Sequence, residues 1–343
     1  MFGRSAKPIR VTVYGKTDRG RTREHNEDCF LVADLTRRAA SADLGVPPAL
    51  REQEVGERGS LLMVADGMGG AAAGELASEM ATRTIYDHLT GAWTGEREAT
   101  PQRFAYRLRE AVETANAQIH THARTRPELR GMGTTTTAVG VLGDHLYLTQ
   151  VGDSRAYLVR EGRAIQLTKD QSLMQRLVEA GELTEEEAAR SERRNIILQA
   201  LGPDPRVKVD LTHQDLRRGD VLVLCSDGLS GQVKSEEIAQ VVATTGDLAA
   251  ACDRLIALAN QRGGPDNITV VLARFHGDGL RPADAGEEVG HQVYPLIDTE
   301  TSTEPVPVYT GSRPPRPARD SRARVVALVV LAVVLALAWY LTR

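Results

Sequence analysis

The chain has 343 residues, which is enough for one large core with appendages. Its 41% apolar and 26% charged residues are ordinary for a globular protein, and a formal net charge of −4 gives no electrostatic reason to expect nucleic-acid binding. The three cysteines, Cys29, Cys225 and Cys252, form no Cys-x-x-Cys pair and stand in apolar surroundings. This pattern argues against a disulfide framework or a zinc site and predicts buried thiols in a reducing compartment.

The predicted elements arrive in blocks of strands and blocks of helices. In chain order we expect strands at 9–16 and 29–35, a loop insertion over 37–60, a buried strand at 61–65, helices at 74–89 and 101–125, and four strands at 134–142, 145–151, 156–160 and 164–167. A charged helical flap over 171–194 follows, then strands at 207–211 and 221–225, helices at 235–244 and 248–262, and a closing strand at 268–275. This order favours α+β layers over a doubly wound parallel sheet.

The C-terminal part differs in composition from the rest. After a folded domain over 1–276, residues 277–324 are rich in Pro, Thr, Glu and Arg and predict a flexible, disordered linker. Residues 325–341 carry no charge and reach the short end of the length that spans a bilayer, the alternative being a buried core helix. Five arginines precede this segment and only Arg343 follows it. The positive-inside rule therefore predicts a tail-anchored, single-pass cell-membrane protein whose N-terminal domain is cytoplasmic.

Acidic residues recur at the ends of predicted strands. They are Asp66, Asp153, Asp227, Asp266 and the Asn26-Glu27-Asp28 cluster. Each one alone is most simply a turn or cap residue. If these strand ends meet at one rim, however, the crowded carboxylates repel one another, and divalent cations relieve the repulsion. An all-oxygen ligand set favours Mg²⁺ or Mn²⁺ over Zn²⁺.

Six ordered segments resemble those of the metal-dependent protein phosphatases of the PPM (type 2C) family. They are RTREHNED (21–28), VADGMGG (64–70), GMGTTTTA (131–138), VGDSRAY (151–157), CSDGLS (225–230) and GGPDNITVV (263–271). The resemblance covers about residues 11–275 and is greatest for the bacterial membrane-anchored members that oppose Ser/Thr kinases. It implies a four-layer α-β-β-α sandwich of two antiparallel sheets flanked by helices, with a C-terminal transmembrane helix added in this chain.

The resemblance also implies roles for individual residues. Asp66 would bridge two Mn²⁺ or Mg²⁺ ions, one of them completed by Glu27 and the Gly67 carbonyl. The other ion would be held by Asp227 and Asp266. Asp153 with Asp227 would form a third metal site, and Asp28 would support the ligands from behind. Asn267 would orient Asp266, and Arg155 would have a structural role. The catalytic Arg23 would bind the substrate phosphate.

The implied function is hydrolysis of phosphoserine and phosphothreonine in proteins by direct attack of a metal-bridging hydroxide. The implied partners are phosphorylated proteins, among them a membrane Ser/Thr kinase and its substrates. One departure concerns Met68, where many eukaryotic relatives carry a histidine proposed to protonate the leaving group. Bacterial relatives commonly have methionine there, so we expect a metal-bound water to supply that proton. His25 is a candidate ligand, although a surface role or a supporting role behind the ligands is the simpler expectation.

Other phosphatase chemistries fail on spacing. No cysteine is followed by arginine at the sixth position, no DxDx[TV] stretch exists, and neither glycine-rich segment continues as GK[ST]. A non-catalytic, membrane-tethered phosphoprotein-binding module of the same fold remains the alternative. Such a module would be expected to have lost metal carboxylates, whereas Glu27, Asp66, Asp227 and Asp266 are all present.

Overall fold

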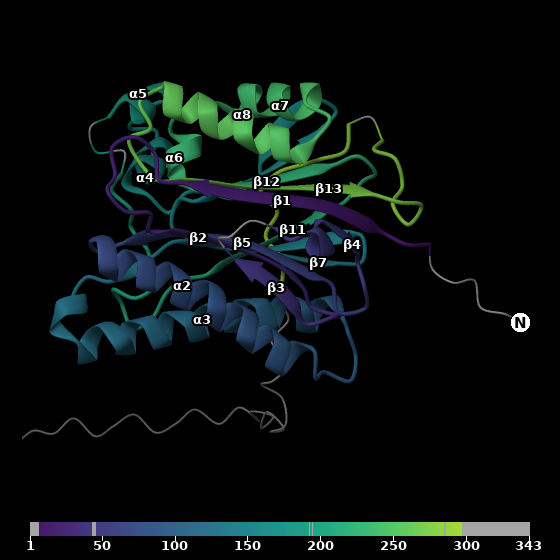
Figure 1. Cartoon of the computed structure of the whole chain (residues 1–343), viewed down its shortest axis with the longest axis horizontal. Coiled ribbons are helices and arrows are strands. Elements are labelled where there is room, and N and C mark those ends of the chain that lie inside the picture. Colours follow the sequence, from purple (N-terminus) through teal and green to yellow (C-terminus); the bar gives the residue numbers. More distant parts are fainter. Residues whose placement is uncertain (1–6, 43–45, 192, 194, 285, 297–343) are drawn as a thin grey trace, which may run out of the picture. The chain divides into compact units, whose positions relative to one another are not determined.

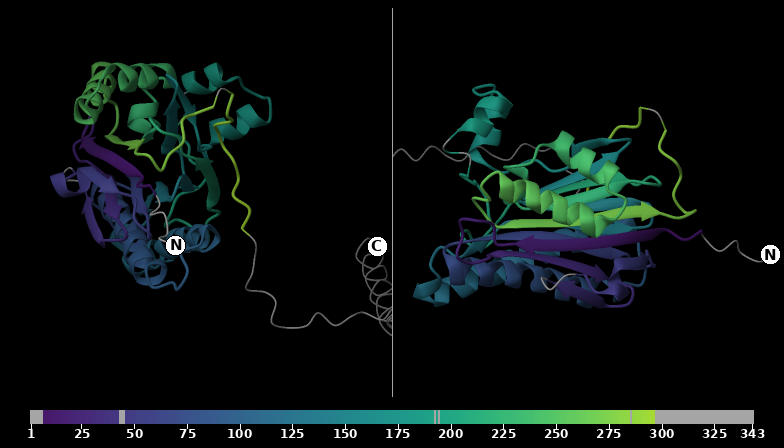
Figure 2. Two further views of the ribbon diagram at one scale, coloured as in Figure 1. Left: turned by 90° about the vertical axis from the view of Figure 1, so that its right-hand side faces the viewer. Right: turned by 45° about the horizontal axis from the view of Figure 1, so that its top comes forward.

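The computed structural model describes residues 7–42, 46–191, 193, 195–284 and 286–296, which belong to a compact unit, Met1–Ile297. Within this unit two antiparallel sheets stack face to face, and helices cover the outer face of each (Figures 1 and 2). The predicted α+β sandwich of two antiparallel sheets is therefore confirmed. The predicted transmembrane segment, residues 325–341, lies outside the described residues; within them, no helix is long and apolar enough to cross a membrane.

The first sheet has six strands in the order β10-β9-β12-β13-β1-β4. Its strands are β1 (Arg10–Asp18), β4 (Glu52–Glu54), β9 (Arg155–Arg160), β10 (Arg163–Gln166), β12 (Val221–Cys225) and β13 (Ile268–His276). The second has seven strands in the order β11-β8-β7-β5-β2-β3, with β6 paired to β5. These are β2 (Asp28–Asp34), β3 (Ala39–Ala42), β5 (Ser60–Met68), β6 (Gly133–Thr134), β7 (Thr136–Leu142), β8 (His145–Val151) and β11 (Asp210–Asp215).

Helices α2 and α3 cover the seven-stranded sheet, and α7 and α8 cover the six-stranded one (Figure 1). The helices are α1 (Pro48–Arg51), α2 (Ala71–His88), α3 (Pro101–Thr125), α4 (Leu173–Glu179), α5 (Glu185–Arg190), α6 (Asp227–Ser230), α7 (Ser235–Thr244) and α8 (Leu248–Gln261). A π-helical turn, Leu89–Trp93, prolongs α2, and a 3₁₀ turn, Pro127–Leu129, follows α3. The Thr100 side chain accepts from the Arg103 N–H, and Pro101 occupies the first turn, which together fix the start of α3.

Alternation along the strands builds three apolar layers. In β5, Leu61 and Met63 face the α2–α3 layer, whereas Leu62 and Val64 face the other sheet. A third cluster fills the space beneath α7 and α8. Strands buried on both faces are continuously apolar, which is why residues 61–65 stand out in the sequence.

Two predictions of local structure differ from the observed elements. The expected loop insertion over 37–60 contains β3, α1 and β4, short elements whose polar and alanine-rich sequences carry little periodic signal. The strand expected at 207–211 lies instead at Asp210–Asp215, where all six residues pair along β8 although only Leu211 is apolar.

The first part of the predicted linker is packed against the folded unit. We call the described residues 277–284 and 286–296 the C-terminal strap. The strap adds to the free edge of β11, since the His213 N–H donates to the Gln292 carbonyl (2.9 Å) and the Tyr294 N–H to the Leu211 carbonyl (3.0 Å). These bonds cover a sheet edge that would otherwise expose unpaired backbone groups. The predicted linker boundary at 277 therefore differs from the structure.

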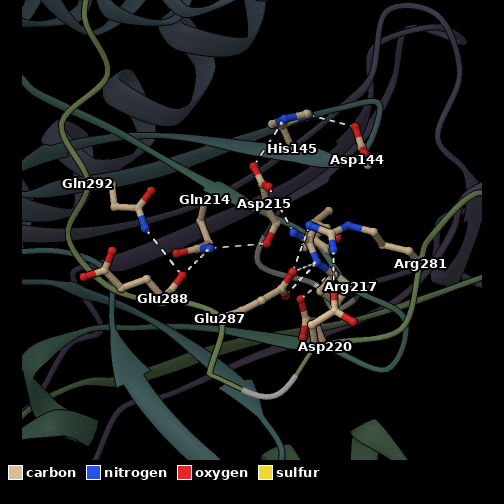
Figure 3. A network of polar contacts seen from close by, with 12 residues as sticks. Asp144, His145, Gln214, Asp215, Arg217, Asp220, Arg281, Glu287, Glu288 and Gln292 are labelled. Carbon is tan, nitrogen blue, oxygen red and sulfur yellow. Dashed lines mark hydrogen bonds and ion pairs between the residues drawn. The ribbon is translucent and has the colours of Figure 1, made fainter.

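A charged network fixes the middle of the strap (Figure 3). Glu287 lies 2.7 Å from Arg217 and 2.8 Å from Arg281, and Asp220 lies 2.7 Å from Arg160. Arg160 and Arg217 are only 6% and 4% exposed. Buried guanidinium groups of this kind need carboxylate partners. The strap supplies one of them.

Candidate metal centre

Strand pairing brings the predicted carboxylates to one rim of the sandwich. β2 pairs antiparallel with β5 so that Asp28 stands directly opposite Asp66. On the facing sheet, β12 leads into α6 at Asp227, and Asp266 precedes β13, the neighbour of β12. Four acidic residues distant in the chain thus converge because the ends of their strands do.

Burial and mutual repulsion show in the pKa values of this cluster. Burial, followed by the charges of Asp28 and Asp227, raises the pKa of Asp66 well above its usual range. Burial raises the pKa of Asp28 to about 7, despite hydrogen bonds that favour its ionised form. The pKa of Asp227 rises to about 6, through burial and then the charge of Asp266. The rim therefore concentrates negative charge that the chain itself does not balance.

Asp153 joins the cluster from the turn between β8 and β9. Burial, followed by the charge of Asp227, raises its pKa to about 8. The Gly152 N–H that precedes it donates to the Gln171 side chain (3.0 Å), whose Nε2 in turn donates to Asp210 (3.1 Å). Gln171, to which the sequence assigned no role, therefore ties the Asp153 turn to the beginning of the flap.

Two hydroxyl groups orient Asp28. The Ser226 and Thr269 hydroxyls each donate to Asp28 Oδ2 over 2.7 Å. The Ser226 hydroxyl accepts from the Thr269 N–H (3.0 Å), so its own proton is free for the carboxylate. Both donors engage Oδ2 and leave Oδ1 without one. The sequence pattern carries no signal for Ser226 and Thr269, although each lies within two residues of a predicted site residue.

Two buried oxygens in the cluster lack partners. Among the described residues, neither Asp28 Oδ1 nor Asp227 Oδ1 meets a hydrogen-bond donor. A buried carboxylate oxygen left unpaired is costly, so such atoms mark a place where a ligand belongs. An all-oxygen donor set suits a hard divalent cation such as Mg²⁺ or Mn²⁺. By the chemistry of their donors, the residues fit the expected metal.

The cluster is not a finished coordination sphere. Across the described ranges, no group of three or more His, Cys, Asp or Glu side chains is already arranged to hold a metal ion. Asp266 is engaged by Arg23 at 2.7 Å, and Asp66 is within hydrogen-bonding reach of Asp227. Both contacts lower the repulsion among the carboxylates, and a cation would replace them.

The corner after Asp66 admits only glycine at position 67, and Glu27 packs closely against Gly74 of α2. A Cβ at Gly67 would collide with the carbonyl oxygens of Gly74 and Glu27, and one at Gly74 would collide with the Glu27 carboxylate. The Gly67 N–H donates to the Glu27 carbonyl (3.1 Å). Glu27, whose pKa burial raises, is thereby held beside this corner.

Asn267 organises the segment that carries Arg23 and Glu27. Its Nδ2 donates to the carbonyls of Arg19 and His25 (2.9 Å each), and its Oδ1 accepts from the Glu27 N–H (2.8 Å). Its own N–H donates to Asp266 Oδ1 (2.9 Å). The role expected for Asn267 beside Asp266 is thus wider than the sequence suggested.

A hollow of about 950 Å³ adjoins the cluster. Arg23, Asp153, Asp227 and Asp266 line it together with residues of the flap and of α7. Arg155 also reaches it, but its guanidinium is paired with Asp170 (2.7 Å), which agrees with a structural role. The half-exposed Arg23 therefore shares this hollow with three carboxylates.

Solved structures share the fold of this chain. The chain is similar to the Mycobacterium tuberculosis serine/threonine phosphatase PstP/Ppp, with 37% identity, a TM-score of 0.63, and coverage of 78% of this chain and 98% of that chain. It is also similar to the catalytic domain of PstP in complex with two manganese ions (36%, TM-score 0.62, coverage 78% and 99%). The S. agalactiae serine/threonine phosphatase is 35% identical, with a TM-score of 0.65 and coverage of 78% of this chain and 99% of that chain. The chain thus has the fold of these serine/threonine phosphatases.

The family follows from the sequence comparisons. The family described as Protein phosphatase 2C matches residues 50–272. PstP of Mycobacterium tuberculosis is 41% identical over 239 residues, 70% of this chain and 45% of that protein. The Listeria welshimeri phosphatase stp is 37% identical over 258 residues, 75% of this chain and 93% of that protein. The chain belongs to the protein phosphatase 2C family, and it spans less than half the length of its mycobacterial relative.

Proposed function

We propose that the protein is a metal-dependent serine/threonine phosphatase that hydrolyses phosphoserine and phosphothreonine in other proteins. The observation that carries this proposal is the buried acidic rim, where Asp28 and Asp227 each present an oxygen with no partner among the described residues. The rim opens onto a hollow that Arg23 also lines. Membership of the protein phosphatase 2C family supports the same reaction.

The rim can hold Mn²⁺ or Mg²⁺. In our proposal Asp66, the Gly67 carbonyl and Glu27 serve one ion, and Asp227 and Asp266 serve the other. Asp153, whose pKa is raised by burial and then by the charge of Asp227, would share a third ion with Asp227 in this proposal. When bound, such ions lower the pKa of water and neutralise phosphoryl oxygens.

Arg23 supplies the phosphate contact in this proposal. Asp266 holds one end of its guanidinium at 2.7 Å, and the side chain is 49% exposed. A guanidinium can donate to two phosphoryl oxygens at once, so Arg23 would fix the phosphate against the acidic rim. Its pKa is raised by Asp266, which keeps it charged.

The chain's other side chains restrict the chemistry. All three cysteines are buried, and burial raises the pKa of Cys225 to about 12, so none provides a thiolate nucleophile. Met68 cannot donate a proton to the leaving oxygen. We therefore assign that proton to a water molecule held at the acidic rim, as the sequence led us to expect.

We further propose that residues 325–341 anchor the protein in the cell membrane as a single span, with the phosphatase domain in the cytoplasm. The support is the uncharged length of the segment and the arginines that precede it. A membrane Ser/Thr kinase and its substrates are then the expected partners. Fractionation of cells expressing the full chain or a chain ending at residue 297 tests this; equal recovery of both in the soluble fraction would reject the anchor.

Hydrolysis of a phosphothreonine peptide by the full-length chain tests the activity. We expect phosphate release with Mn²⁺, no release with a chelator, and no release by Asp66→Asn. Asp87→Asn is the matched control, because Asp87 is 66% exposed on α2 and should leave the rate unchanged. Equal rates for the parent and Asp66→Asn would reject the proposal and favour a phosphoprotein-binding module without turnover.

A further inference from the structure

A second pocket lies at the end of α3, next to the acidic rim. Its volume is about 480 Å³. It is bounded by the last turns of α3, by the segment that follows them, and by the turn at Gly202 and Pro203. We call it the arginine pocket, after Arg124 and Arg130 in its wall. None of the residues assigned to the metal centre lines it.

The two arginines of this pocket are unpaired. In the part of the chain that the structure describes, neither guanidinium has a carboxylate or other hydrogen-bonding partner. Arginines earlier in α3 behave differently, since Arg103 and Arg107 both pair with Glu96 at 2.6 Å. A basic side chain in a last helical turn offsets the helix dipole, which accounts for Arg124. Arg130 lies five residues beyond the end of α3, where that effect does not reach.

The rest of the wall is apolar or rigid. Ala123, Pro127, Met132 and Pro203 contribute apolar surface, and Met132 is fully buried. His120 is fixed in the wall by its Nδ1–H, which donates to the Gly202 carbonyl (2.8 Å). Unpaired guanidinium groups beside apolar surface suit an oxyanion that is carried on a peptide, because the peptide can cover the apolar part.

The pocket is within reach of the acidic rim. Met132 in its floor lies three residues before Thr135, whose N–H donates to the Asp66 carbonyl (2.8 Å). Gly133 pairs with Met68 in the corner that follows Asp66. Three extended residues span at most about 11 Å. A short peptide segment can therefore bridge the two sites.

We propose that the arginine pocket binds a second phosphoryl group of the phosphoprotein substrate, so that the protein prefers segments phosphorylated at two nearby positions. The inference rests on the proposed phosphatase function and specifies its substrate class. A phosphoryl group carries roughly −1.5 to −2 charges at pH 7 and three acceptor oxygens. Two guanidinium groups can satisfy it more fully than they can satisfy a single carboxylate.

Peptide kinetics with the full-length chain and Mn²⁺ provide the test. One peptide carries a single phosphothreonine; the others carry a second one about two to six residues away on either side. We expect kcat/KM to rise about tenfold for at least one spacing. Arg124→Gln with Arg130→Gln should abolish this preference and leave the singly phosphorylated peptide unaffected. Arg97→Gln with Arg254→Gln removes the same charge from exposed sites elsewhere and should retain the preference.

A binding measurement separates this inference from the proposed catalysis. Fluorescence anisotropy of a labelled, doubly phosphorylated peptide is measured on Asp66→Asn with and without the pocket substitutions. Weaker binding after Arg124→Gln with Arg130→Gln supports the pocket. It does so even if the parent protein hydrolyses no peptide, because the absence of hydrolysis would reject only the phosphatase proposal. Equal binding by both proteins overturns the inference. An equal gain in affinity when glutamate replaces the second phosphothreonine also overturns it.

Discussion

Neutralising one carboxylate of the acidic rim should stabilise the metal-free protein. Burial, then the charge of Asp266, raises the pKa of Asp227 from 3.8 to about 6 in the folded state. The folded protein therefore binds this proton more tightly than the unfolded chain does. The stability gained in this way is fully present below about pH 4 and is lost as the pH rises through about 6. The difference between 3.8 and about 6 corresponds to about 3 kcal/mol.

The substitution Asp227→Asn keeps the shape of the side chain and removes its charge. We compare the variant and the parent in the compact unit, Met1–Ile297, with a chelator present at about pH 8. The free energy of unfolding of the variant should be higher than that of the parent by up to about 3 kcal/mol. Near pH 4 the two should be equal. Urea denaturation followed by tryptophan fluorescence measures the difference, because Trp93 is fully buried and is the only tryptophan in this unit.

Saturating Mn²⁺ should reverse the order of stability, since the ion stabilises whichever folded protein binds it better and an amide is the weaker ligand. Two results would refute the reasoning. One is a metal-free variant that is less stable than the parent at about pH 8. The other is a stability difference that does not change between about pH 8 and pH 4.

Three further predictions follow from single contacts. Arg23→Lys should lower kcat/KM for a phosphopeptide by about 10–100-fold through loss of a two-point phosphate contact, and an unchanged value would contradict that role. Thr269→Val removes one donor from Asp28 and should weaken Mn²⁺ binding about tenfold in a titration; equal affinity would exclude orientation by this hydroxyl. A chain that ends after His276 leaves Arg217 without Glu287. Its free energy of unfolding, measured by urea denaturation, should be about 3 kcal/mol lower than that of a chain that ends at residue 297.

The sequence located the acidic rim because strand ends can be recognised one at a time. An apolar run that stops at an aspartate and small residues marks Asp66 and Asp227 without any knowledge of the fold. Their convergence required the register of β2 against β5 and of β12 against β13, which the sequence pattern does not contain. The family resemblance supplied that information in advance.

Long-range polar contacts were beyond prediction for a different reason. Glycine, proline and charged residues make up more than half of the strap, which is why it resembles a linker, yet Glu287 meets Arg217 across 70 positions of sequence. Likewise, the Ser226 hydroxyl reaches Asp28 across 198 positions. Neither pairing leaves a periodic signal, because each depends on where separate strands come to rest.

Equilibrium titration of Mn²⁺ tests the central claim most directly, because it asks whether the acidic rim is the cation site. The parent protein should bind about two ions with high affinity. Asp66→Asn should lose this binding together with phosphopeptide hydrolysis, whereas Asp87→Asn should keep both. Undiminished high-affinity Mn²⁺ binding by Asp66→Asn would contradict the account.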